Sequence, residues 1–216
     1  MAKFKSDFMI IKNIFFAILF FFTFSSNQSI AQWSFGIDGG LNIGKSTPSN
    51  LHTGSELFYK NGVVFGGVIN YKINNYFNIH SGLRYDQKGG KMTHNNPGFV
   101  GNATVYYNYL EVPLQILYIP FDIELKPTLI VGVNISYILL AKGEGTINNQ
   151  TRIEDDTKNI DNRFDVFLET GVGIMPKIND DLFYSFTASY YYGVSDLDEY
   201  IATSGFHLLL GIYYNL

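Results

Sequence analysis

The fold is decided by one stretch of the sequence, YLEVPLQILY at residues 109–118. Apolar side chains occupy every second position from Leu110 to Tyr118, and polar ones such as Glu111 and Gln115 lie between them. A period of two places successive side chains on opposite faces, which predicts a β-strand with one apolar and one polar face. An amphipathic helix would space its charged residues differently.

The same alternation recurs along the chain. It is found in eight segments, at residues 33–43, 63–73, 77–86, 109–118, 128–137, 164–174, 184–192 and 207–216. Each has about the length that a tilted strand needs to cross a bilayer. No stretch after residue 32 is long and apolar enough for a transmembrane helix. Because lipid cannot satisfy a free sheet edge, the strands must close on themselves. The sequence therefore predicts an all-β fold, a closed antiparallel eight-stranded transmembrane β-barrel.

The connections between these segments alternate in length. Long ones are expected at residues 44–62, 88–106, 141–162 and 193–205, and short ones at 74–75, 120–124 and 176–181. Bacterial outer-membrane barrels have long extracellular loops and short periplasmic turns. The pattern predicts that both chain ends lie in the periplasm.

The composition favours the same class of protein. Aromatic residues make up 17% of the chain, with 16 Tyr and 19 Phe, whereas charged residues make up only 16%. Membrane barrels use aromatic side chains as girdles at both interfaces. The chain has no cysteine, which excludes disulfides, thiolate metal sites and a cysteine nucleophile. A formal charge of −4 argues against nucleic-acid binding.

The first residues are typical of an export signal. Lys3, Lys5 and Lys12 precede an apolar run at residues 14–24, and small residues follow as far as Ala31. We expect a signal peptide at residues 1–31, cleaved near Ala31, and a barrel domain at residues 32–216. The alternative, an uncleaved membrane helix, has an apolar run too short to span well.

Ten polar residues lie on the inward phase of the predicted strands. They are Asp38, Lys72, His80, Arg84, Asp86, Glu111, Gln115, Asp165, Glu169 and His207. Eight strands leave an interior just wide enough for side chains, so we expect a structural polar network there. Arg84 and Glu111, on neighbouring strands, are expected to form its central pair. A narrow gated pore and a small ligand pocket are the alternatives.

Two segments also carry a family resemblance. LRYDQKG at residues 83–89 and YLEVPL at 109–114 resemble, in the same order, motifs of the Bacteroidetes PorT-like outer-membrane β-barrel family. The Gly-rich strand at residues 35–40 and YYYG at 190–193 match as well. The resemblance implies a bacterial outer-membrane location, and for its name-giving member a link to protein secretion.

For function, the sequence favours a structural or interaction role through the extracellular loops, without catalysis, cofactor or metal. Expected partners are outer-membrane lipid and lipopolysaccharide, the barrel-assembly machinery during insertion, and proteins at the outer loops. One alternative is a narrow pore or an accessory of a protein-secretion system. Another is an outer-membrane enzyme that uses the loop residues His52 and His94. No G-x-S-x-G or H-E-x-x-H motif is present to support it.

Overall fold

The computed structural model describes residues 33–48, 54–96, 99–121, 123–147, 150–155, 163–194 and 201–216. The predicted signal peptide and its cleavage site lie outside these residues. The strands of the described part are β1 (Trp33–Pro48), β2 (Ser55–Lys72), β3 (Phe77–Asn96), β4 (Phe99–Tyr118), β5 (Pro127–Ile147), β6 (Gln150–Asp155), β7 (Phe164–Ile174), β8 (Leu182–Gly193) and β9 (Ile201–Asn215).

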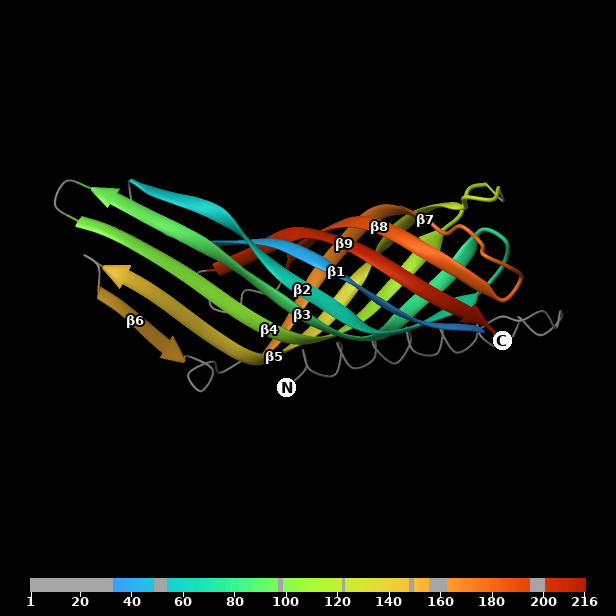
Figure 1. Cartoon of the computed structure of the whole chain (residues 1–216), viewed down its shortest axis with the longest axis horizontal. Coiled ribbons are helices and arrows are strands. Elements are labelled where there is room, and N and C mark those ends of the chain that lie inside the picture. Colours follow the sequence, from blue (N-terminus) through green and yellow to red (C-terminus); the bar gives the residue numbers. More distant parts are fainter. Residues whose placement is uncertain are drawn as a thin grey trace, which may run out of the picture. The chain divides into compact units, whose positions relative to one another are not determined.

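Eight of these strands pair in a ring (Figure 1). Every pairing is antiparallel, and the pairing of β1 with β9 joins the first strand to the last. A long ladder between β4 and β5, with one register shift between Asn108 and Tyr109, completes the circle. The ninth strand, β6, lies outside the ring and pairs with the end of β5. The all-β antiparallel barrel predicted from the sequence is therefore confirmed, with β6 as an addition.

The two faces of the ring differ as the alternation predicts. On β4, Leu114 is 44% exposed on the outside of the ring, whereas its neighbours toward the interior, Glu111 and Gln115, are 0% and 4% exposed. Aromatic pairs line the outer face near the short turns, as Trp33 does with Tyr71. In a soluble barrel the apolar side chains face inward. Here they face outward, as a hydrocarbon environment requires.

The short turns lie where the sequence placed them, but three of the four predicted long loops are largely strand. β3 and β4 stay paired from Lys88 opposite Tyr107 to Asn96 opposite Phe99. β1 continues to Pro48, and β5 continues to Ile147. The apolar alternation ends earlier because these extensions have no apolar face, so periodicity could not reveal them. In the described residues no helix has the length and hydrophobicity to span a bilayer.

The lipid-facing assignment predicts the effect of a charge at Leu114. We expect Leu114→Arg to lower the free energy of unfolding from lipid vesicles by about 2–4 kcal/mol, the cost of Arg near the bilayer midplane. Urea titration monitored by Trp fluorescence measures it. Asn61→Arg, on an outer stretch of β2 beyond the apolar band, is the matched control and should change little. Equal effects of the two substitutions would contradict the assignment.

Candidate functional site

The barrel interior holds most of the polar residues singled out in the sequence. Asp38, His80, Arg84, Asp86, Glu111, Gln115, Asp165, Glu169 and His207 are all buried. Lys72 is the exception, because it is the last residue of β2 and its side chain is exposed at the rim of the barrel. The expectation that Lys72 belongs to the interior network is therefore corrected.

The centre of the network is a lysine that the sequence analysis placed in a loop. The Lys88 ammonium lies 2.6 Å from Asp86 Oδ2 and 2.5 Å from Glu111 Oε2, and all three side chains are fully buried. The Ser136 hydroxyl donates to the same Glu111 oxygen at 2.9 Å. A buried cation thus bridges two buried carboxylates from β3 and β4.

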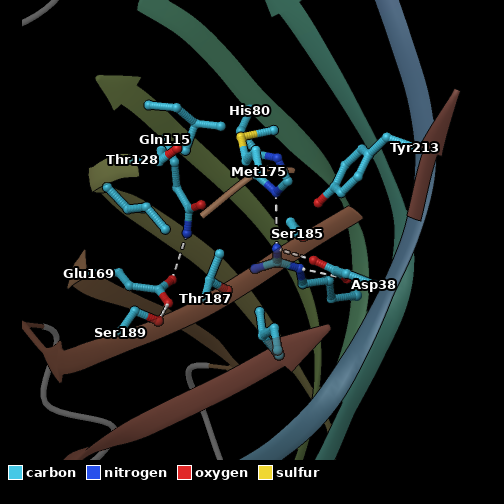
Figure 2. Close-up of a pocket in the computed structure, with 14 residues that line it drawn as sticks. Asp38, His80, Gln115, Thr128, Glu169, Met175, Ser185, Thr187, Ser189 and Tyr213 are labelled. Carbon is cyan, nitrogen blue, oxygen red and sulfur yellow. Dashed lines mark hydrogen bonds and ion pairs between the residues drawn. The ribbon is translucent and has the colours of Figure 1, made fainter. Parts of the chain in front are cut away.

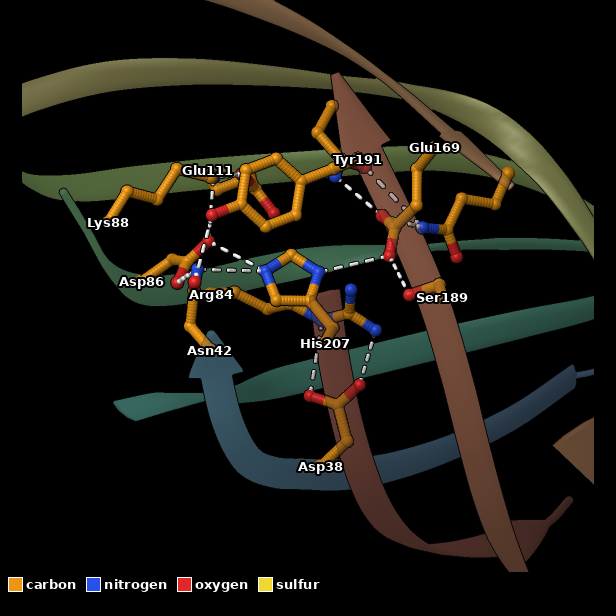
Figure 3. A network of polar contacts seen from close by, with 12 residues as sticks. Asp38, Asn42, Arg84, Asp86, Lys88, Glu111, Glu169, Ser189, Tyr191 and His207 are labelled. Atoms are coloured by element: carbon orange, nitrogen blue, oxygen red, sulfur yellow. Dashed lines mark hydrogen bonds and ion pairs between the residues drawn. The ribbon is translucent and has the colours of Figure 1, made fainter. Parts of the chain in front are cut away.

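A histidine joins this centre to the opposite wall of the barrel (Figure 3). His207 Nε2 lies 3.0 Å from Asp86 Oδ2, and His207 Nδ1 lies 3.0 Å from Glu169 Oε1. Both ring nitrogens therefore face carboxylate oxygens, an arrangement that a doubly protonated imidazolium satisfies by donating to both. His207 links β3, β7 and β9 through the lumen.

Glu169 is the most heavily bonded carboxylate of the network. Gln115 donates to its Oε2 at 2.7 Å, and Asn134 donates to the same oxygen at 2.6 Å. The Ser189 hydroxyl donates to Oε1, the oxygen that also faces His207. Side chains from β4, β5, β8 and β9 thus converge on one residue of β7, so its charge is compensated by donors from half of the ring.

Arg84 does not form the predicted pair with Glu111. The two residues are opposite each other in the β3–β4 ladder. The Arg84 guanidinium instead binds Asp38 of β1 through Nε and Nη2, while Glu111 is held by Lys88. Arg84 Nη2 also lies 2.9 Å from His80 Nε2. The long Arg side chain reaches past β2 to β1. Register partners on the wall are therefore not always side-chain partners inside it.

Apolar layers cover the network at both ends. On the outer side, the rings of Tyr109, Phe167 and Tyr191 surround the Lys88 ammonium, whose Nζ lies 4.1 Å from the Phe167 centroid. These rings pack edge to face, with interplanar angles of 86° for Tyr109–Phe167 and 89° for Phe167–Tyr191. On the side of the short turns lies a second cluster, formed by Val68, Leu117, Ile130, Met175, Phe183 and Tyr213.

A small cavity remains between the network and this second cluster (Figure 2). Its volume is about 20 Å³, and Asp38, His80 and Glu169 contribute to its wall. Arg84 Nη1 is buried and has no hydrogen-bond partner among the described residues. A space of this size admits about one water molecule and is far too small for an organic ligand.

The network contains residues that the sequence analysis did not single out. Besides Lys88 they include Asn42, whose amide nitrogen donates to Asp86 at 2.7 Å, and Tyr191, whose hydroxyl donates to Asn42 at 2.8 Å. The inward phase of β3 continues from Arg84 through Asp86 to Lys88, a signal that was available in the sequence. Asn42 and Tyr191 carry no charge, so a search for charged residues on the inward phase does not find them.

Of the two histidines of the enzyme alternative, only His94 lies in the described residues. His94 Nδ1 lies 2.9 Å from the hydroxyl oxygen of Ser55, its directly opposed residue in the β2–β3 ladder. His52 lies outside the described residues. Ladder geometry alone brings Ser55 and His94 together, so the contact is no sign of catalysis. Among the residues that the structure describes, no group of three or more His, Asp or Glu side chains is arranged to hold a metal ion.

The family of the chain follows from its sequence together with this architecture. The family model described as "Outer membrane protein beta-barrel domain" matches residues 24–199. The chain belongs to this family. An outer-membrane β-barrel protein resides in the bacterial outer membrane, as the lipid-facing exterior requires. No curated protein matches the chain.

One solved structure supports the fold of this outer-membrane barrel, and two others align with it less closely. The protein OprG from Pseudomonas aeruginosa aligns with a TM-score of 0.51 at 12% identity, over 86% of this chain and 97% of its own. The attachment invasion locus protein Ail of Yersinia pestis aligns with a TM-score of 0.41 at 14% identity, over 87% and 100%. Neisserial surface protein A gives 0.40 at 11% identity, over 84% and 97%. At such identities the likeness concerns the fold alone.

The buried position of Lys88 predicts a large loss of stability on its removal. Lys88→Met leaves the Asp86 and Glu111 carboxylates without their shared cation, which should lower the free energy of unfolding by about 3–5 kcal/mol. Lys142→Met is the matched control, because Lys142 pairs with Glu144 at 3.3 Å with both side chains 36% exposed. The control should cost at most about 1 kcal/mol.

Urea unfolding of both variants in the same lipid vesicles makes this comparison. A Lys88→Met barrel as stable as the control would show that the carboxylates do not depend on this ammonium.

Proposed function

We propose that this outer-membrane barrel is a closed scaffold that acts through its extracellular parts, without catalysis and without conducting ions. The observation that carries the proposal is the filled interior. A polar network lies between an aromatic layer around Phe167 and an apolar layer around Met175. Ions would have to displace buried, mutually bonded side chains, which costs several kcal/mol for each uncompensated charge.

The extracellular part is built from long strands. β3 and β4 have 20 residues each and β5 has 21, whereas β7 and β8 have 11 and 12. About 9–11 residues suffice to cross the bilayer, so one side of the barrel extends well beyond it. In Figure 1 the ends of β2 to β6 project together past the ring. We call this projecting sheet the outer arm.

The outer arm suits contact with a partner. Its strands carry polar side chains at their ends, such as Thr93 opposite Asn102, together with exposed apolar ones such as Phe58 and Ile153. A rigid paired sheet presents these groups at a lower entropic cost than a flexible loop would. The arm therefore supports an interaction role, with protein partners or surfaces as its targets.

The narrow pore and the secretion accessory stand as alternatives to the scaffold. Membership of the PorT-like branch rests on the motifs at residues 83–89 and 109–114. The secretion role of its name-giving member would require partners that bind the same outer arm or the periplasmic turns. The enzyme alternative depends on His52 and His94. The contact of His94 with Ser55 follows from their ladder positions.

Planar-bilayer recording separates the scaffold from the pore. The purified barrel is expected to insert without a steady current, because both ends of the interior are covered by packed side chains. Insertion itself is verified by the slower gel mobility of the sample after boiling. A steady single-channel conductance of the unmodified protein would overturn the closed scaffold.

Shortening the outer arm tests the interaction role. We expect a chain whose residues 93–102 are replaced by an Asn-Gly turn to fold normally, since such turns join paired strands directly. Cells that carry this chain should show the phenotype of a complete deletion. A phenotype identical to that of the unmodified protein would place the function outside the end of the β3–β4 hairpin.

A further inference from the structure

The small cavity beside Arg84 lies between two groups of hydrogen-bonded side chains in the barrel interior. We propose that it is a binding site for one water molecule, which is held by Arg84 Nη1 and by the hydroxyl groups of Ser185 and Thr187 on β8. The inference goes beyond the proposed function and does not depend on it, because no part of the outer arm is involved.

The hydrogen bonds of Arg84 leave one end of its guanidinium without a partner. A guanidinium has five N–H donors, one on Nε and two on each terminal nitrogen. Arg84 Nε donates to Asp38 Oδ1 at 3.2 Å, and Nη2 donates both to Asp38 Oδ2 and to His80 Nε2. Nη1 is buried, and it has no hydrogen-bond partner among the described residues. Because Arg84 lines the cavity, the Nη1 donors are available to a molecule inside it.

His80 accepts a hydrogen bond from Arg84 because its other ring nitrogen is bound to Asn70. His80 Nδ1 lies 2.7 Å from Asn70 Oδ1, an amide oxygen that can only accept. The proton of the neutral imidazole is therefore assigned to Nδ1, which leaves Nε2 as an acceptor for Arg84 Nη2. Asp38 and His80 together fix the plane of the guanidinium, so Nη1 cannot turn toward another side chain.

The wall of the cavity carries charges of both signs, which favours a neutral ligand. Arg84 attracts an anion, but Asp38 and Glu169 also line the cavity and repel it. Arg84 repels a cation, and Glu169 has no free lone pair for one, because four side chains already face its two oxygens as donors. An ion of either sign is therefore disfavoured at this position.

The volume and the lining of the cavity identify the neutral ligand as water. The volume of about 20 Å³ holds one water molecule, which needs about 10–15 Å³ on this measure. A buried water also needs about two to four polar partners. Arg84 Nη1 supplies a donor, and Ser185 and Thr187 supply hydroxyl groups at the same cavity (Figure 2). Water both accepts and donates, so it can satisfy all three groups.

The bound water connects opposite walls of the barrel. Asp38, Asn70, His80 and Arg84 form one hydrogen-bonded group on β1, β2 and β3. Among the described side chains, no hydrogen bond joins this group to β8 or to the group around Glu169. Strands β3 and β8 have three strands between them in either direction around the ring. Through the water, Arg84 of β3 is bonded to hydroxyl groups of β8 across the lumen.

A crystal structure of the barrel, at a resolution that shows ordered water, tests the site directly. We expect a single density peak at hydrogen-bond distance from Arg84 Nη1. Crystals soaked in bromide and in rubidium distinguish water from ions, because either ion gives an anomalous signal where it binds. We expect no anomalous peak in the cavity with either soak.

Two matched substitutions test the site in lipid nanodiscs. Thr187→Ile places additional apolar atoms in the cavity, whereas Thr170→Ile makes the same change at an exposed position of β7. In the unmodified barrel we expect a nuclear Overhauser effect between a long-lived water and the guanidinium protons of Arg84. The effect should be lost in Thr187→Ile, because the water is expelled, and should remain in Thr170→Ile.

Each other outcome overturns the proposal. A cavity without a density peak would show that no water is bound, and an anomalous peak would assign the site to an ion. A file of waters that reaches bulk solvent would replace the single site by an open path. An Overhauser effect that persists in Thr187→Ile would place the water elsewhere, and its loss in Thr170→Ile would show an unspecific disturbance. Heat-dependent gel mobility verifies folding, and the crystal structure of the unmodified barrel decides if Thr187→Ile does not fold.

Discussion

The Lys88 ammonium, held between the Asp86 and Glu111 carboxylates, is the interaction on which the interior depends. Its importance follows from a chain of constraints. Lipid satisfies no backbone hydrogen bond, so the sheet must close. A ring of eight strands leaves room for side chains and little else. Side chains that are charged and enclosed must then neutralise one another, because an uncompensated charge in such a place costs several kcal/mol.

Further ion pairs neutralise the other buried carboxylates of the barrel interior. His207 connects Asp86 to Glu169, and Arg84 of β3 neutralises Asp38 of β1. The three basic side chains thus meet four carboxylates, and amide and hydroxyl donors satisfy much of the remainder. Apolar layers on both sides keep water from these pairs, which strengthens them. A barrel built in this way is suited to hold its outer arm rigidly, and its chemistry with the surroundings takes place on its outer surface.

Much of the fold could be predicted from the sequence, because a lipid exterior forces the period of two. The stretch at residues 109–118 shows it clearly, and the outward Leu114 and inward Glu111 lie on the faces that the pattern predicts. The outer arm could not be predicted in this way. Beyond the membrane neither face of a strand needs to be apolar, so the pairing of residues 88–96 with 99–107 left no periodic signal.

The interior was less accessible to sequence reasoning for a related reason. The phase of a strand gives the side on which a residue lies, but side-chain length decides which partner it reaches. Arg84 and Glu111 are opposed on the wall, yet Arg84 binds Asp38 of β1 and Glu111 binds Lys88 of β3. Lys88 was overlooked because the strand was expected to end before it.

The central claim, an enclosed and ion-paired interior around Lys88, is tested most directly by nitrogen-15 NMR of lysine ammonium groups in lipid nanodiscs. Exposed ammonium protons exchange rapidly with water at neutral pH. We expect one ammonium signal that persists at neutral pH, couples to the Asp86 and Glu111 carboxylates, and disappears in Lys88→Met. Rapid exchange of every lysine ammonium, with no signal lost in that variant, would show that water reaches Lys88 and would contradict the account.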